Sequence, residues 1–163
     1  MSDTANDQAA QTSGAEHPIS PREIGHVVLR VRDLAVSVPF YERLGFTKVG
    51  ESPGAMAFFT ATGANHHDLA LQQVGSDAPA QLPFGVGLYH IAIRLPSDDH
   101  VRAAFRTLAS AGVEMTGTAD HAVSHSLYLK DPDGIEIELY ADVENWDELP
   151  ESERLVIRPW DPR

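Results

Sequence analysis

The sequence lacks cysteine, is poor in basic residues and has no long apolar run, and each of these absences excludes a class of protein. With no cysteine among 163 residues, disulfides, thiolate metal sites and cysteine nucleophiles are excluded. Only 12 lysines and arginines stand against 24 aspartates and glutamates, giving a net charge of −12, so nucleic acid and anionic membranes are poor partners. No apolar run approaches the ~20 residues of a membrane span, and residues 1–20 lack the basic region followed by an apolar one that is typical of a secretory signal. We therefore expect a cytoplasmic protein.

Histidine, by contrast, is abundant. The chain has eight histidines, and without thiolates the available metal ligands are imidazoles and carboxylates. Hydrophobic residues make up 42% of the sequence, which is enough for a real core, and the length suits one compact domain.

Hydrophobic periodicity indicates one order of elements, strand, helix and three strands, that occurs twice. We expect the first unit to contain strand 24–31, a helix over 34–44 and strands 46–50, 55–61 and 67–74; the second should contain strand 88–95, a helix from Ser97 to Gly112 and strands 113–118, 124–130 and 135–141.

The expected division of the chain follows from this repeat. Residues 1–20 are polar and aperiodic, which predicts a disordered arm. Residues 21–142 should form a single domain, with modules at about 24–74 and 87–142. Residues 143–163 form an acidic tail, and its two tryptophans suggest that it packs over the cup that the two modules would form, or against a partner subunit.

Three strands of the repeat place a possible metal ligand on their polar face. In the strand after the turn Asp-Pro-Asp-Gly, apolar residues alternate with Glu136 and Glu138. The first strand of each unit carries a histidine, His26 or His90, 64 positions apart. If these faces meet, His26, His90 and Glu138 form a set of two histidines and one carboxylate, which suits a non-haem ferrous iron with open coordination positions. Glu136 shares the face of Glu138 and is the alternative carboxylate.

Several motifs in this order resemble a known family. They are GHVVLRVRDL, FYERLGF, HHDLAL, GLYHIAIRLPS and DHAVSHSLYLKDPDGIEIELYAD, followed by a tryptophan. Together they resemble the vicinal oxygen chelate superfamily, which includes glyoxalase I, fosfomycin-resistance proteins, bleomycin-binding proteins and extradiol dioxygenases, and most of all its catechol 2,3-dioxygenase group. The resemblance implies an α+β fold in which paired βαβββ modules form a cup-shaped mixed sheet.

The resemblance also implies roles for individual residues. His26, His90 and Glu138 match the family's iron ligands, which favours Glu138 over Glu136. His67 matches an acid–base histidine, and Tyr128 matches a tyrosine that contacts the substrate oxygen.

Two further histidines have expected places. His121 resembles another histidine close to the iron ligands. His66 should point away from the site, because it neighbours His67 on the strand that we expect there.

The implied function is an Fe(II)-dependent extradiol dioxygenase that cleaves a small aromatic diol with O2 and forms a homo-oligomer such as a dimer; Mn(II) or another divalent metal is the alternative cofactor. The alternative functions are a metalloenzyme like glyoxalase or the fosfomycin-resistance proteins, and a non-catalytic drug-binding protein. Glyoxalase I supplies a fourth ligand from the last strand of the first unit, where this chain has Ala70 and Leu71, with Gln72 next to them.

Overall fold

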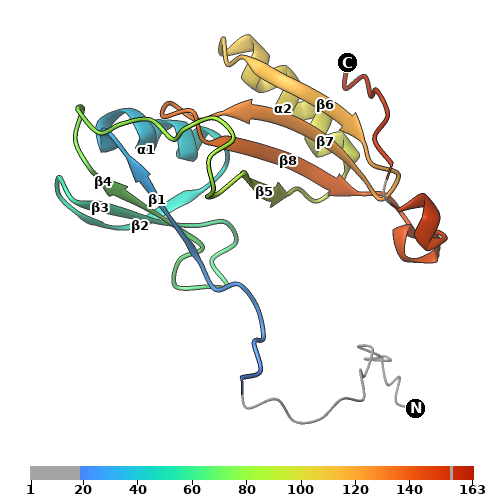
Figure 1. Cartoon of the computed structure of the whole chain (residues 1–163), viewed down its shortest axis with the longest axis horizontal. Coiled ribbons are helices and arrows are strands. Elements are labelled where there is room, and N and C mark those ends of the chain that lie inside the picture. Colours follow the sequence, from blue (N-terminus) through green and yellow to red (C-terminus); the bar gives the residue numbers. More distant parts are fainter. Residues whose placement is uncertain (1–18, 155) are drawn as a thin grey trace.

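The computed structural model describes residues 19–154 and 156–163 and contains the expected repeat (Figure 1). Nearly all of the predicted disordered arm lies outside the described residues. The elements in chain order are β1 (Val27–Val31), α1 (Leu34–Arg43), β2 (Thr47–Ser52), β3 (Met56–Thr60), β4 (Leu69–Gln73), β5 (His90–Arg94), α2 (Asp98–Ser110), β6 (Met115–Asp120), β7 (Ser124–Lys130), β8 (Glu136–Asp142) and the short 3-10 helices η1 (Trp146–Glu148) and η2 (Glu151–Glu153).

Each module forms its own four-stranded sheet, in the order β1-β4-β3-β2 and β5-β8-β7-β6. In both sheets the first and last strands of the module pair in parallel, and the other pairs are antiparallel. The predicted α+β fold of paired βαβββ modules is thus confirmed. The two sheets stay separate, so β1 and β5 are both edge strands.

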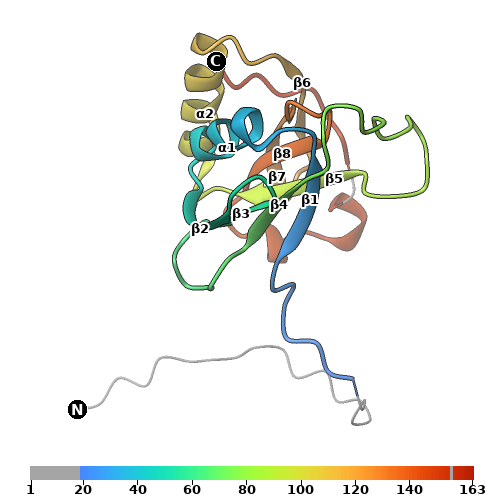
Figure 2. The same cartoon turned by 90° about the vertical axis from the view of Figure 1, so that its left-hand side faces the viewer.

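The apolar faces of the sheets and helices share one core. It includes fully buried residues of both modules, among them Tyr41, Phe59, Leu127 and Ile137. Both helices lie on the same side of the molecule (Figure 2). Because β strands alternate, burying this face turns the opposite, polar face of each sheet outward.

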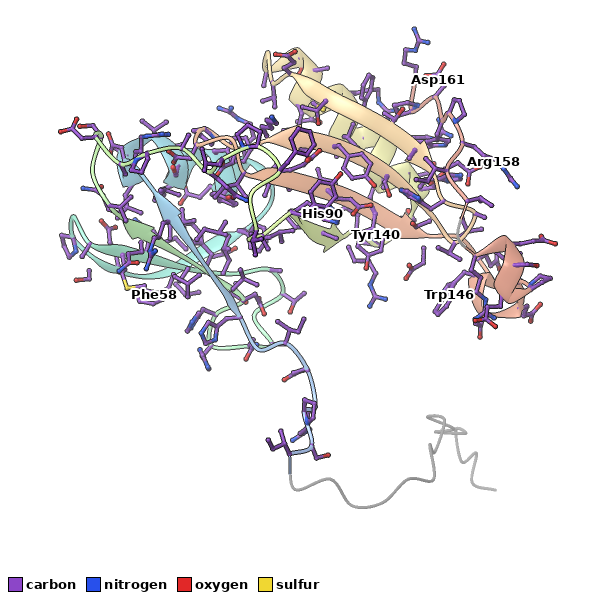
Figure 3. All side chains as sticks on the ribbon, in the orientation of Figure 1. Phe58, His90, Tyr140, Trp146, Arg158 and Asp161 are labelled. Atoms are coloured by element: carbon purple, nitrogen blue, oxygen red, sulfur yellow. The ribbon has the colours of Figure 1, made fainter. Side chains whose placement is uncertain are left out.

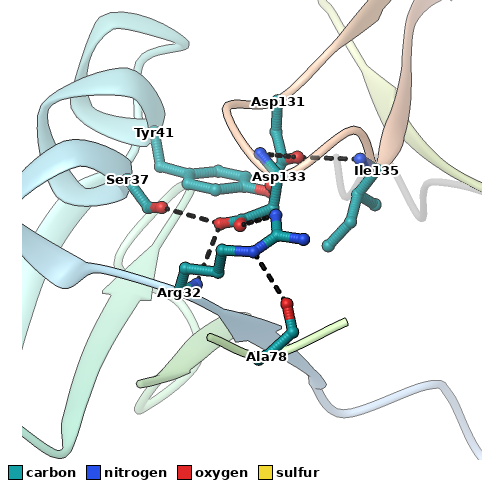
Figure 4. Close-up of polar contacts among 7 residues, drawn as sticks. All are labelled: Arg32, Ser37, Tyr41, Ala78, Asp131, Asp133 and Ile135. Carbon is teal, nitrogen blue, oxygen red and sulfur yellow. Dashed lines mark hydrogen bonds and ion pairs between the residues drawn. The ribbon is translucent and has the colours of Figure 1, made fainter. Parts of the chain in front are cut away.

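A clamp of polar contacts joins the two modules (Figure 4). The Tyr41 hydroxyl of α1 donates to Asp131 at 2.9 Å, and Arg32, just after β1, pairs with Asp133 at 2.9 Å. Asp131 is buried and also accepts the backbone N–H of Asp133 and Ile135. Gly134 completes this turn at φ 88°, which favours glycine. The turn before β8 thereby holds the second module against the first.

One predicted strand begins later than expected. We expected a strand over 67–74, but β4 starts at Leu69. The Asp68 carboxylate accepts the backbone N–H of Ala61 at 2.7 Å and the hydroxyl of Thr60 at 3.0 Å, which closes residues 61–68 into a loop. His67 therefore lies in a loop instead of a strand.

No helix in the described part of the chain has the length and apolar character needed to cross a membrane.

Candidate functional site

The second sheet brings together three of the predicted site residues. Tyr128 on β7 lies directly opposite Glu138 on β8, and its hydroxyl is 2.9 Å from Oε1 of Glu138. On the other side of β8, the ring of His90 places Nε2 at 3.1 Å from Oε2 of the same carboxylate. His90 is opposite Glu136 in the strand register, yet its ring leans toward Glu138. Glu138 is held from both sides, and its side chain is only 11% exposed.

His121 extends these contacts into a chain of hydrogen bonds. It lies between β6 and β7, with its Nε2 at 2.8 Å from the Tyr128 hydroxyl. A carboxylate only accepts, so the Tyr128 proton is directed to Glu138 and His121 Nε2 must donate to the phenol oxygen. Burial, and then the hydrogen bond and charge of Glu138, raise the pKa of Tyr128 to about 12, so the phenol stays protonated at neutral pH. We call His90, His121, Tyr128 and Glu138 the His90–Glu138 cluster.

This cluster opens into a cavity of about 440 Å³. The cavity is also lined by Ala92, Val123, Ser124, Tyr140, Arg154, Val156 and Ile157. Figure 3 shows His90 and Tyr140 on the second sheet, with the C-terminal segment beyond the strand ends. A larger cavity, of about 940 Å³, lies between β1 and the linker after β4, and no predicted site residue lines it.

The remaining predicted residues gather on the first module. The ring of His26, just before β1, lies 4.4 Å from that of His67 and 6.2 Å from that of His66, measured between centroids. Asn65 ties the loop to this segment by donating to the Gly25 carbonyl at 2.7 Å. We call His26, His66 and His67 the three-histidine cluster.

The expected orientation of His66 is wrong. Its Nδ1 lies 2.6 Å from Nδ1 of His67, so the two rings are in contact instead of pointing to opposite sides. The cause is the loop over residues 61–68, since alternation to opposite faces applies only within a strand. Desolvation, followed by electrostatic repulsion from the neighbouring His66 and His26 rings, lowers the pKa of His67.

The two clusters differ from a complete metal site within one chain. Two donors bound side by side to one ion at ~2.0–2.2 Å lie about 3 Å apart, so the 3.1 Å between His90 and Glu138 suits adjacent ligands; it equally suits a hydrogen bond. Among residues 19–154 and 156–163, however, no three His, Cys, Asp or Glu side chains are arranged to hold a metal ion. A single chain therefore brings together two of the three predicted ligands and leaves His26 apart.

The sequence interpretation missed the residues that the C-terminal tail contributes to the cavity, namely Arg154, Val156 and Ile157. The two tryptophans predicted that the tail packs over the cup or against a partner subunit, but no local pattern indicates which tail residues reach the cavity.

Comparison with known proteins agrees with this architecture. A family model described as the Glyoxalase/Bleomycin resistance protein/Dioxygenase superfamily matches residues 23–139. The Catechol-2,3-dioxygenase of Bacillus subtilis (strain 168) is 38% identical over 119 residues, which are 73% of this chain and 41% of that protein. Biphenyl-2,3-diol 1,2-dioxygenase 3 of Rhodococcus globerulus is 36% identical over 126 residues, which are 76% of this chain and 65% of that protein.

The chain thus spans less than two thirds of the length of either relative. Among solved structures, a glyoxalase/dioxygenase from Nostoc punctiforme superimposes with a TM-score of 0.66 at 21% identity, over 80% of this chain and 100% of that one. At that identity the likeness concerns the fold alone.

Proposed function

The chain belongs to the Glyoxalase/Bleomycin resistance protein/Dioxygenase superfamily, and from its dioxygenase relatives we infer that it is an extradiol dioxygenase acting on a catechol with O2. In this reaction the ring C–C bond beside the two hydroxyl-bearing carbons breaks, and both atoms of O2 enter the product. No external reductant is needed. Two relatives at 36–38% identity carry the names of dioxygenases of this kind.

The observation that carries the proposal is the His90–Glu138 cluster in its cavity. It offers an imidazole and a carboxylate at the spacing of adjacent metal ligands, next to a protonated phenol. We propose Fe(II) as the bound metal, with Mn(II) or another divalent ion as the alternative, because two histidines and one carboxylate suit such ions. His26, His90 and Glu138 would hold such an ion, and it would supply the redox chemistry that lets O2 react with the diol.

The protein's own residues then have distinct tasks. Tyr128 would hydrogen-bond an oxygen of the diol, and His121, which donates to the phenol oxygen at 2.8 Å, would fix its orientation. His67 is the proposed acid–base group, and it lies against His26, the proposed third ligand. These assignments follow from the family resemblance together with the contacts.

Because His26 is not gathered with His90 and Glu138 in one chain, we propose that a second copy supplies it. Closing the modules onto each other within one chain would disturb the clamp, in which Tyr41 binds the buried Asp131 and Arg32 binds Asp133. Breaking buried polar contacts of this kind is costly. Completion by a partner copy leaves the clamp intact.

An exposed apolar segment next to the cluster favours such a partner. In the linker that leads to His90, residues Phe84, Val86 and Tyr89 are 108%, 111% and 79% exposed. Exposed apolar residues in one segment offer a surface that a protein partner can cover. We therefore propose a homodimer in which each site combines the three-histidine cluster of one copy with the His90–Glu138 cluster of the other.

The test is oxygen uptake by protein purified without oxygen and loaded with Fe(II). We expect one O2 to be consumed for each molecule of catechol, and the product should have the summed mass of catechol and O2. Metal-loaded protein that binds catechol but consumes no O2 with it or with a substituted catechol would overturn the proposed function.

A further inference from the structure

The tail after β8 returns to the second sheet and is fixed there at several points. Arg158 forms an isolated antiparallel bridge with Asp120 at the end of β6, with two backbone hydrogen bonds of 2.8 and 2.9 Å. The Thr118 hydroxyl donates to the Trp160 carbonyl at 2.6 Å. Figure 3 shows Arg158 and Asp161 on the segment that runs beside this sheet. The described end of the tail thus packs against the second module.

Trp160 is the main side-chain anchor. Its ring stacks on His125 of β7, with centroids 4.8 Å apart and planes 6° from parallel, and the Arg102 guanidinium of α2 lies 4.9 Å from the Trp160 centroid. His125 is itself held by Asp98 at 2.7 Å. Arg102 also donates to the Asp161 carbonyl at 2.9 Å. Aromatic stacking and cation–π contacts of this kind stabilise a docked segment.

Between this anchor and the 3-10 helices, the tail lines the cavity. Val156 and Ile157 line the same cavity as His90, Tyr128 and Glu138, and Ile157 is 80% exposed. On the sheet side, Ala92 and Val123 line it as well. Arg154 is the one arginine or lysine of the lining, and its guanidinium already donates to the carbonyls of Leu149 and Asp147.

We propose that the C-terminal tail selects the substrate: Val156 and Ile157 form a wall that contacts the ring substituent of a catechol bound at the His90–Glu138 cluster, and they favour an apolar substituent. The inference rests on the proposed function. A cavity of about 440 Å³ leaves room for a group beyond the diol ring. Burying an apolar substituent against an apolar wall is favourable. A charged substituent would lose water there and find no polar partner on the wall. The exposure of Ile157 gives it apolar surface for the substituent to cover.

The test compares the binding of catechol and 3-phenylcatechol to metal-loaded protein by calorimetry without oxygen. The unaltered protein should bind 3-phenylcatechol more tightly. In the double variant Val156→Ser with Ile157→Ser, this preference should shrink about tenfold, the scale of small changes in an apolar pocket, while metal content and catechol affinity stay the same. Val36→Ser, an exposed valine on α1 outside this cavity, is the matched control and should keep the preference.

The anchor provides a second, independent variant. Trp160→Ala should release the wall and reduce the preference although Trp160 does not line the cavity, and Trp160→Phe should retain most of it by stacking on His125. An unaltered protein without the preference, or a preference that survives both the double variant and Trp160→Ala, would overturn the inference. Failure of the proposed function would give a different result. The unaltered protein would then still bind the two catechols with different affinities but would take up no O2.

Discussion

Glu138 illustrates how one residue on a strand becomes available for chemistry. Its neighbours Ile137 and Leu139 are buried in the core, so alternation sends the carboxylate to the opposite face. There it is nearly covered, and burying a charge is costly unless it is paired. Tyr128 and His90 provide that pairing. A carboxylate fixed in this way, beside an imidazole, is the arrangement from which a metal site can be built.

The loop histidines allow a test at the same scale. His67→Ala should slow turnover of catechol by ~10²–10⁴-fold, the usual contribution of a positioned acid–base group, with metal content unchanged. His66→Ala should cause a smaller loss, because its ring contacts and orients His67. His100→Ala is the control and should be silent, since His100 lies in the first turn of α2 and contacts Ser97. Oxygen consumption at matched iron content measures all three, and full activity of His67→Ala would exclude its assigned role.

At the scale of elements, local chemistry predicted most of the fold. Asp33 caps α1 by accepting the N–H of Ala35 at 2.8 Å, as an aspartate before an apolar stripe should. The strand predicted at residues 124–130 coincides with β7. Such features depend on residues close in sequence, and for that reason they can be predicted from it.

The misplaced elements depend on contacts that sequence pattern does not encode. The start of β4 is set by the Asp68 side chain binding Ala61 and Thr60, and an aspartate before an apolar run does not reveal these partners. The position of the tail depends on the stacking of Trp160 on His125, which is far away in the sequence. The sequence was enough to predict that His90 and Glu138 come together, because each lies on the polar face of a predicted strand. The wall formed by Val156 and Ile157 could not be predicted in this way.

The clamp between the modules gives the prediction at this scale. Tyr41→Phe should lower the free energy of unfolding by ~1–3 kcal/mol, because the buried Asp131 loses a hydrogen-bond donor. Ser37→Ala should change it much less, since that hydroxyl lies 3.4 Å from Asp133. Urea unfolding followed by circular dichroism measures both. A Tyr41→Phe protein as stable as the Ser37→Ala protein would show that this hydrogen bond adds nothing to the stability of the clamp.

For the whole molecule, the repeat predicted two modules but not their relative placement. That placement depends on the turn before β8, which contacts α1 and the end of β1 through side chains. As a result the two polar faces carry separate halves of the proposed site. The apolar residues of the linker, exposed beside His90, give a second copy a surface to cover.

The most direct test of a metal site shared between two copies is the metal content of mixed dimers. The single variants His26→Ala and Glu138→Ala should each bind less than about a tenth of the metal bound by unaltered protein. Loss of a residue that hydrogen-bonds to a ligand already lowers metal affinity about 10–100-fold, and loss of the ligand itself should lower it more. Glu136→Ala, on the same face of β8, should bind the normal amount.

Dimers that contain one His26→Ala chain and one Glu138→Ala chain, isolated through two different tags, should recover about half the normal metal, because one of their two symmetric sites keeps all three ligands. Mixed dimers as empty of metal as the single variants, or an unaltered protein that binds metal as a monomer, would contradict the shared site.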